Sequence, residues 1–153
     1  MARPARLCAV ERAALYVGVH EQPPGSNRGE WIDKWNREAG VPAGSQWCMS
    51  FQHAMFQLCG VKLGGWASVG NFLAWAQARG YEVKRPRRGD LICFEWEHDS
   101  WPDHVGSAER VLALRWKGGR FVGWVRYIAG NDGNAVSRRT RWMTERDRFC
   151  RVV

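Results

Sequence analysis

Hydrophobic residues follow a helical spacing in the first half of the chain and a strand-like pattern in the second half. The first half predicts four helices, because apolar side chains recur every three or four residues and glycines follow the last turns. We expect these helices at residues 4–17, 30–38, 45–58 and 68–79. The segment 21–29 contains two prolines and two glycines, which predicts a loop.

Short apolar runs separated by glycine and asparagine turns predict strands in the second half. The expected strands are 91–94, 104–114, 121–128, 135–142 and 149–153. Helices followed by strands favour an α+β fold, with N-terminal helices packed against one face of a C-terminal antiparallel β-sheet. No repeat or linker interrupts the pattern, so we expect a single domain over 1–153.

Composition narrows the function classes without selecting one. Hydrophobic residues make up 45% of 153, and no apolar run approaches the ~18 residues that a membrane span needs. The first residues lack the apolar stretch of a secretory signal, so we expect none. The net charge is +8, which attracts nucleic acid, acidic lipid or an anionic cell-wall polymer alike.

The five cysteines are odd in number and scattered, and none forms a Cys-x-x-Cys pair. This pattern argues against a disulfide framework or a zinc knuckle and favours buried, reduced thiols. At least one cysteine must remain unpaired within the chain, as a nucleophile would.

Three residues in a fixed order carry the candidate chemistry. With Ser45 as N-cap, Cys48 is the third residue of a helical first turn, where free backbone N–H groups favour the thiolate. His104 opens a later strand and is the candidate general acid and base. Asn131 follows the strand that contains Val125, and its amide oxygen can accept a hydrogen bond from an imidazole.

Four motifs in this order resemble one enzyme family. They are Gln-Trp-Cys-Met-Ser-Phe at 46–51, Pro-Arg-Arg-Gly-Asp-Leu-Ile at 86–92, Asp-His-Val-Gly at 103–106 and Ala-Gly-Asn at 129–131. The arrangement resembles the CHAP domains (cysteine, histidine-dependent amidohydrolases/peptidases), which are related to the NlpC-type cell-wall peptidases and have a papain-like core. The loop 21–29 also resembles a loop of phage-associated members, so the likeness spans nearly the whole chain.

The resemblance implies a cysteine hydrolase of peptidoglycan amide bonds, with Cys48 as nucleophile, His104 as acid and base, and Asn131 as the orienting group. Many members carry a glutamate where this chain has Ala129, which leaves the carboxylate support of His104 open. Some relatives bind calcium through an acidic loop ahead of the cysteine. No Asp-x-Asp-x-Asp spacing occurs in this chain, so we expect no metal and no cofactor.

Three residues near the cysteine in sequence or motif are predicted to bind substrate. Trp47 adjoins Cys48, Gln46 precedes it, and Glu21 lies in the loop 21–29. An aromatic face at Trp47 suits a peptide or a sugar ring. For any single tryptophan, core packing is the competing interpretation.

We therefore expect a bacteriolytic, antimicrobial enzyme of the phage endolysin type, acting as an N-acetylmuramoyl-L-alanine amidase or a peptide endopeptidase. Its partners would be bacterial peptidoglycan and an anionic cell-wall polymer, with no specific nucleic acid, and it would be a monomer. It would be made in the host cytoplasm without a signal peptide and reach the wall after membrane permeabilisation, or be part of a virion.

Three alternatives remain at this point. The same cysteine and histidine could serve a cysteine protease or deamidase effector that acts on proteins. The charge of +8 alone supports a basic nucleic-acid-binding domain. Four residues close in sequence could bind zinc as in zinc-dependent amidases, although their spacing is not typical of a zinc site: His98, Asp99, Asp103 and His104.

Overall fold

The computed structural model describes residues 2–153 and begins with four helices. They are α1 (Ala5–Leu15), α2 (Glu30–Glu38), α3 (Cys48–Gln57) and α4 (Val69–Ala78), so all four predicted helices are confirmed. Ser68 caps α4, because its hydroxyl accepts the N–H of Asn71 at 3.3 Å.

Six strands follow and form one antiparallel sheet. They are β1 (Glu82–Val83), β2 (Leu91–Phe94), β3 (His104–Lys117), β4 (Arg120–Ala129), β5 (Ser137–Met143) and β6 (Arg148–Cys150). Their spatial order is β1-β6-β2-β3-β4-β5, and every pair is antiparallel. The α+β prediction is confirmed, whereas β1 was missed because two residues carry no readable alternation.

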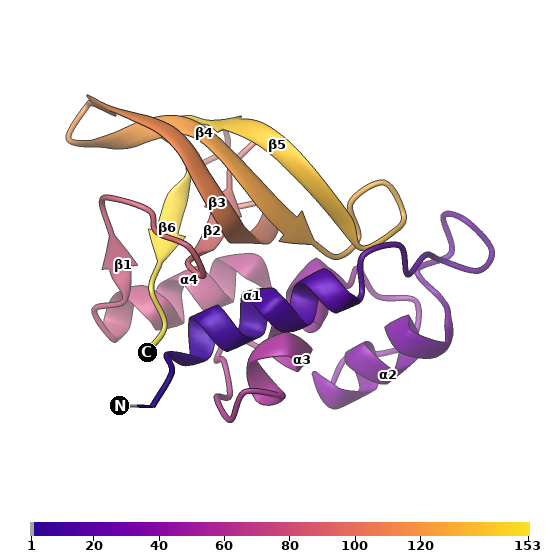
Figure 1. The fold of residues 1–153 in the computed structure, drawn as a ribbon. Coiled ribbons are helices and arrows are strands. Elements are labelled where there is room, and N and C mark those ends of the chain that lie inside the picture. The colour runs from indigo at the N-terminus through magenta and orange to yellow at the C-terminus, as the bar shows by residue number, and fades with distance from the viewer. Residues whose placement is uncertain (1) are drawn as a thin grey trace.

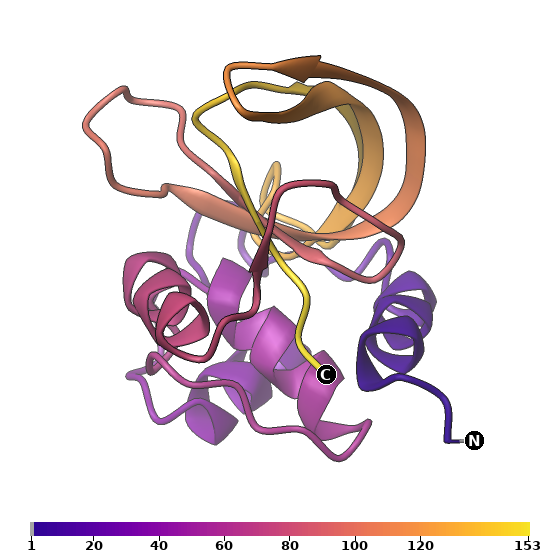
Figure 2. The same cartoon turned by 90° about the vertical axis from the view of Figure 1, so that its left-hand side faces the viewer.

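The helices lie on one side of the sheet, and the main core fills the space between the two layers (Figure 1). Side chains of α3 dominate this core, since all residues from Cys48 to Phe56 are buried. The sheet also curls strongly, so that its second face encloses a smaller apolar cluster (Figure 2). Strand β2 is buried along its whole length because it contributes side chains to both clusters.

The Gly-Asp motif that opens β2 has a structural role. Asp90 is fully buried and accepts two hydrogen bonds from the Arg151 guanidinium, at 3.0 and 2.7 Å, and one from the N–H of Arg87 at 2.8 Å. These contacts connect the start of β2 to the chain after β6. Burial raises the pKa of Asp90, and the hydrogen bond from Arg151 acts in the opposite direction.

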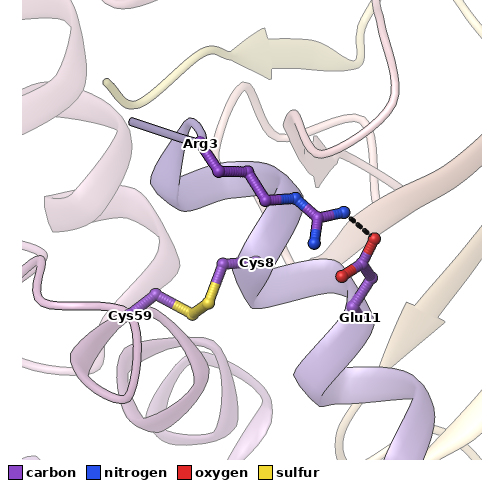
Figure 3. Close-up of a disulfide and its surroundings, with 4 residues drawn as sticks. All are labelled: Arg3, Cys8, Glu11 and Cys59. Atoms are coloured by element: carbon purple, nitrogen blue, oxygen red, sulfur yellow. Dashed lines mark hydrogen bonds and ion pairs between the residues drawn. A yellow bond between two sulfur atoms is a disulfide. The ribbon is translucent and has the colours of Figure 1, made fainter. Parts of the chain in front are cut away.

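One cysteine pair corrects the expectation of reduced thiols. Cys8 of α1 and Cys59, just beyond α3, form a disulfide with a Cα–Cα distance of 6.0 Å (Figure 3). Fifty-one residues separate them, so no local spacing signalled the pair. The other three cysteines are free and buried, as expected: Cys48, Cys93 and Cys150.

Between residues 2 and 153, no helix combines the length and apolar character needed to cross a bilayer.

Candidate active site

Cys48 is the first residue of α3, and the N-cap lies two residues later than the sequence predicted. Ser45 is not the N-cap: its hydroxyl donates back to the carbonyl of Pro42 at 2.7 Å, and Trp47 takes the N-cap position without a side-chain cap. The first helical hydrogen bond runs from Phe51 N–H to the Trp47 carbonyl at 2.9 Å. The N–H groups of the first turn therefore lie at the Cys48 end of the helix without helical partners.

Gln52, one turn after Cys48, fixes α3 against the sheet. Its amide nitrogen donates to the carbonyl of Ile128 in β4 at 3.2 Å, and its amide oxygen accepts from the hydroxyl of Ser107 in β3 at 2.6 Å. All of these groups are buried, so their hydrogen bonds are costly to break. This bridge sets the distance between the helix that carries Cys48 and the strand that carries His104.

His104 is the first residue of β3 and pairs in register with Phe94, the last residue of β2. Trp96, just beyond β2, stacks on the imidazole with ring centroids 5.0 Å apart. The guanidinium of Arg141 lies over the same Trp96 ring, 4.4 Å from its centroid. The aromatic stack restricts the orientation of the imidazole ring.

The turn after β4 approaches the start of α3 closely. A Cβ at Gly130 would lie 2.7 Å from Cβ of Phe51 and 2.9 Å from the Trp47 ring, so this contact requires glycine. The close approach carries the following residues, Asn131 and Asp132, to the end of the sheet where β3 begins. The family-like Gly-Asn turn therefore does lie beside the candidate nucleophile helix.

The residue that faces the imidazole is Asp132, which corrects the expectation for Asn131. Asp132 Oδ2 lies 3.4 Å from His104 Nε2, and within the described chain no hydrogen bond joins the Asn131 side chain to His104. Asn131 instead adopts a left-handed conformation, with φ of 53°. Such a conformation suits asparagine in a turn, and the turn directs the next side chain inward. The one sequence signal for this role was the acidic side chain directly after Asn131.

The electrostatics of the site favour a charged pair. Burial lowers the pKa of His104, but its interactions with Asp132 and Cys48 outweigh this effect and raise that pKa to about 9. Burial likewise raises the pKa of Asp132, yet the interactions with His104 and further partners bring it to about 2. At neutral pH the imidazole is therefore protonated and the carboxylate ionised.

Two further side chains hold Asp132 in place. The Tyr127 hydroxyl donates to Asp132 Oδ2 at 3.0 Å, and the Arg139 guanidinium donates to Oδ1. Burial and the neighbouring carboxylate raise the pKa of Tyr127 to about 12, so the phenol remains a donor at every working pH. No sequence motif connected Arg139 with the site, because its partner Asp132 lies seven residues earlier, in the turn after β4.

Two of the three predicted substrate residues are buried, which corrects their role. Trp47 is fully buried, and its indole N–H donates to Glu21 Oε1 at 3.0 Å. Glu21 is 1% exposed and also accepts the N–H of Gly25 at 2.8 Å. This pair joins the loop 21–29 to the start of α3. Gln46 is exposed and precedes Cys48 by two residues, and its role as a substrate contact stays a prediction.

The two reactive side chains are almost completely buried. Cys48 is 6% exposed and His104 is 5% exposed. The Nε2 atom of His104 faces Asp132, which leaves Nδ1 as the ring nitrogen for the sulfur. A nearly dry environment strengthens electrostatic interactions between ionised groups.

A thiol, an imidazole and a carboxylate in this order form the arrangement expected of a cysteine hydrolase. The family model described as CHAP domain matches residues 39–131, and the chain belongs to this family. The matched segment runs from the end of α2 to the turn after β4 and contains both Cys48 and His104. Membership supports a role as an amidase or peptidase of peptidoglycan. No curated protein and no solved structure matched the chain.

Proposed function

We propose that this protein hydrolyses an amide bond of bacterial peptidoglycan with Cys48 as nucleophile, His104 as general acid and base, and Asp132 as the orienting carboxylate. The observation that carries the proposal is the convergence of Cys48 and Asp132 on one buried imidazole. Asp132 takes the part that the resemblance assigned to Asn131.

In the first half of the reaction, the Cys48 thiolate attacks the carbonyl carbon of the amide. The carbonyl oxygen gains negative charge, which the free N–H groups of the first turn of α3 stabilise. The protonated His104 then gives its proton to the leaving amine as the C–N bond breaks. An amine product leaves, and the acyl group stays on the sulfur as a thioester.

In the second half, neutral His104 accepts a proton from water, and the oxygen attacks the thioester carbonyl. The C–S bond breaks, a carboxylic acid leaves, and the thiolate and imidazolium are restored. Asp132 holds the ring in one orientation through both halves and stabilises the imidazolium form. The reaction consumes one water and needs no cofactor.

An arginine-rich groove supports an anionic cell-wall polymer as a second contact. The groove has a volume of about 710 Å³ and is lined in part by Arg85, Arg87, Arg88 and Arg110. Among residues 2–153, no acidic side chain forms an ion pair with Arg85, Arg87 or Arg110. Unpaired guanidinium groups in a concave surface attract phosphate or carboxylate groups, and salt weakens that attraction.

The choice between amidase and endopeptidase, and the role as a phage lysin, rest on the family resemblance. The loop 21–29 supports the phage-lysin assignment through its likeness to phage-associated members. Mass spectrometry of fragments from defined peptidoglycan distinguishes the two bonds. A free lactyl carboxyl on the glycan indicates an amidase, and a new amino group within the peptide indicates an endopeptidase.

The proposal is tested with Cys48→Ala and the matched control Cys150→Ala, which removes a buried thiol of the core. We expect Cys48→Ala to abolish clearing of a purified cell-wall suspension with the circular dichroism spectrum unchanged. The control should retain most of its activity. Clearing by Cys48→Ala at the wild-type rate would refute the mechanism. Cleavage of a protein panel but not of the wall would favour the protease alternative.

A further inference from the structure

Three carboxylates gather in the loop between β2 and β3, away from the Cys48 helix. Glu95, Asp99 and Asp103 each offer one carboxylate oxygen, and these three oxygens lie within 4.8 Å of one another. The spacing of four residues differs from an Asp-x-Asp-x-Asp pattern, so sequence reading passed over it. Figure 2 shows this salmon-coloured loop projecting beside the curled sheet.

Glu95 is the member of this cluster whose hydrogen bonding is incomplete. It is 8% exposed, and its Oε1 is buried without a hydrogen-bond partner in the described chain. Its other oxygen lies 3.5 Å from the Arg146 Nε atom, which itself lacks a hydrogen bond. A buried carboxylate oxygen without a donor is expensive, because burial removes the water that solvated it.

The other two carboxylates are held with free oxygens. Asp103 Oδ2 accepts the N–H groups of Trp96 at 2.6 Å and Glu97 at 3.1 Å, and Asp99 Oδ1 accepts the N–H of Trp101 at 2.9 Å. These amides fix the carboxylates but carry no net charge. The cluster therefore holds three negative charges against the single positive charge of one arginine.

We propose that this cluster binds a calcium ion. The ligands are all oxygen, which suits a hard cation, and calcium accepts several loop oxygens at about 2.3–2.6 Å in an adaptable geometry. Two oxygens on one such ion lie at most about 5 Å apart, in accord with the observed spread. The zinc set considered from the sequence does not assemble, because His104 faces Asp132 and His98 is not part of the cluster.

The ion would fix the loop that enters the active site. Asp103 immediately precedes His104, and Trp96, whose N–H is bound to Asp103, stacks on the imidazole. Calcium is thus a positioning element for this loop and takes no part in bond making. Its effect on hydrolysis rests on the proposed function, whereas binding itself does not.

Binding is measured on the full chain carrying Cys48→Ala, so that loss of catalysis cannot be confused with loss of the site. Terbium replaces calcium as a luminescent probe, excited through the nearby Trp96 and Trp101, and calcium is then titrated as competitor. We expect displacement with a Kd on the order of 10⁻⁴–10⁻³ M. Asp99→Asn should weaken calcium binding about tenfold or more, since it removes a ligand charge.

Glu97→Gln is the matched control, because Glu97 is exposed in the same loop but outside the cluster. It should bind calcium within about twofold of the parent, as an exposed charge outside the cluster contributes little. Absence of saturable calcium binding up to about 10 mM would overturn the proposal. Equal affinity of Asp99→Asn and its parent, or tighter binding of zinc than calcium that also requires Asp99, would overturn it as well.

Discussion

Replacing Asp132 by asparagine removes one charge from the active site with little change in volume. The pKa of His104 is raised from 6.5 to about 9, with contributions from both Asp132 and Cys48, while that of Asp132 falls from 3.8 to about 2. The two shifts differ because each group also has a partner of its own. We therefore assign about 1–2 pKa units of each shift to the contact between His104 and Asp132. This corresponds to about 1.4–2.7 kcal/mol.

The Coulomb attraction over the 3.4 Å contact gives the upper limit for this pair. At an effective dielectric constant near 20 it amounts to about 5 kcal/mol, and the desolvation of both groups reduces it. The variant should therefore lower the pKa of His104 from about 9 to about 7–8. The imidazolium that protonates the leaving amine then disappears at a lower pH, and the basic limb of the activity profile moves with it.

The interaction between His104 and Asp132 also makes the stability of the fold depend on pH. The raised pKa of His104 stabilises the fold fully below pH 6.5, and this contribution is lost as the pH rises through about 9. The lowered pKa of Asp132 contributes above pH 3.8 and is lost as the pH falls through about 2. Asp132→Asn should therefore be destabilised most between about pH 4 and 6.5, by about 1–3 kcal/mol.

The assay is the rate of wall clearing from about pH 5 to pH 10, with urea unfolding at both ends of that range. Asn131→Gly is the matched control, since glycine accepts the φ of 53° and removes only the side chain. It should leave the basic limb in place. A basic limb that stays near pH 9 in Asp132→Asn, or that moves more in Asn131→Gly, would refute the assignment.

Three further predictions concern the supports around the site. Trp47→Phe removes the 3.0 Å hydrogen bond to buried Glu21 and should lower the unfolding free energy by about 1–3 kcal/mol in urea titrations; an unchanged midpoint contradicts it. Arg151→Met leaves the fully buried Asp90 without its main cation and should cost about 3–5 kcal/mol, seen as early thermal unfolding; a wild-type Tm argues against this. Cys59→Ser opens a loop closed over 51 residues and should cost about 2–4 kcal/mol under oxidising conditions only; equal loss with reductant present excludes a disulfide effect.

Patterns confined to one element were readable from the sequence. The helix 30–38 and the strand 91–94 have the predicted bounds, because local spacing of apolar residues and flanking glycines set them. The start of α3 was not readable in the same way. Serine is a common N-cap residue, but the Ser45 hydroxyl donates to the carbonyl of Pro42 instead. The conformation of the loop before the helix determines this hydrogen bond.

Only part of the candidate site was predictable from the sequence, because the rest depends on contacts between distant segments. The order of cysteine and histidine follows the chain, and the structure brings Cys48 and His104 together. The choice between Asn131 and Asp132 depends on a turn conformation and on how closely Gly130 packs against α3, neither of which a residue pattern contains. Burial of Trp47 depends likewise on the distant partner Glu21.

The sulfur–sulfur bond between Cys8 and Cys59 makes the stability of this protein depend on the redox potential of its surroundings. Thiol buffers of a bacterial cytoplasm keep such pairs reduced, whereas the space beyond the inner membrane favours their oxidation. The bond ties α1 to the far end of the helix that carries the candidate nucleophile. The chain is therefore more easily unfolded under reducing conditions, which open the bond, than under oxidising conditions, which keep it closed.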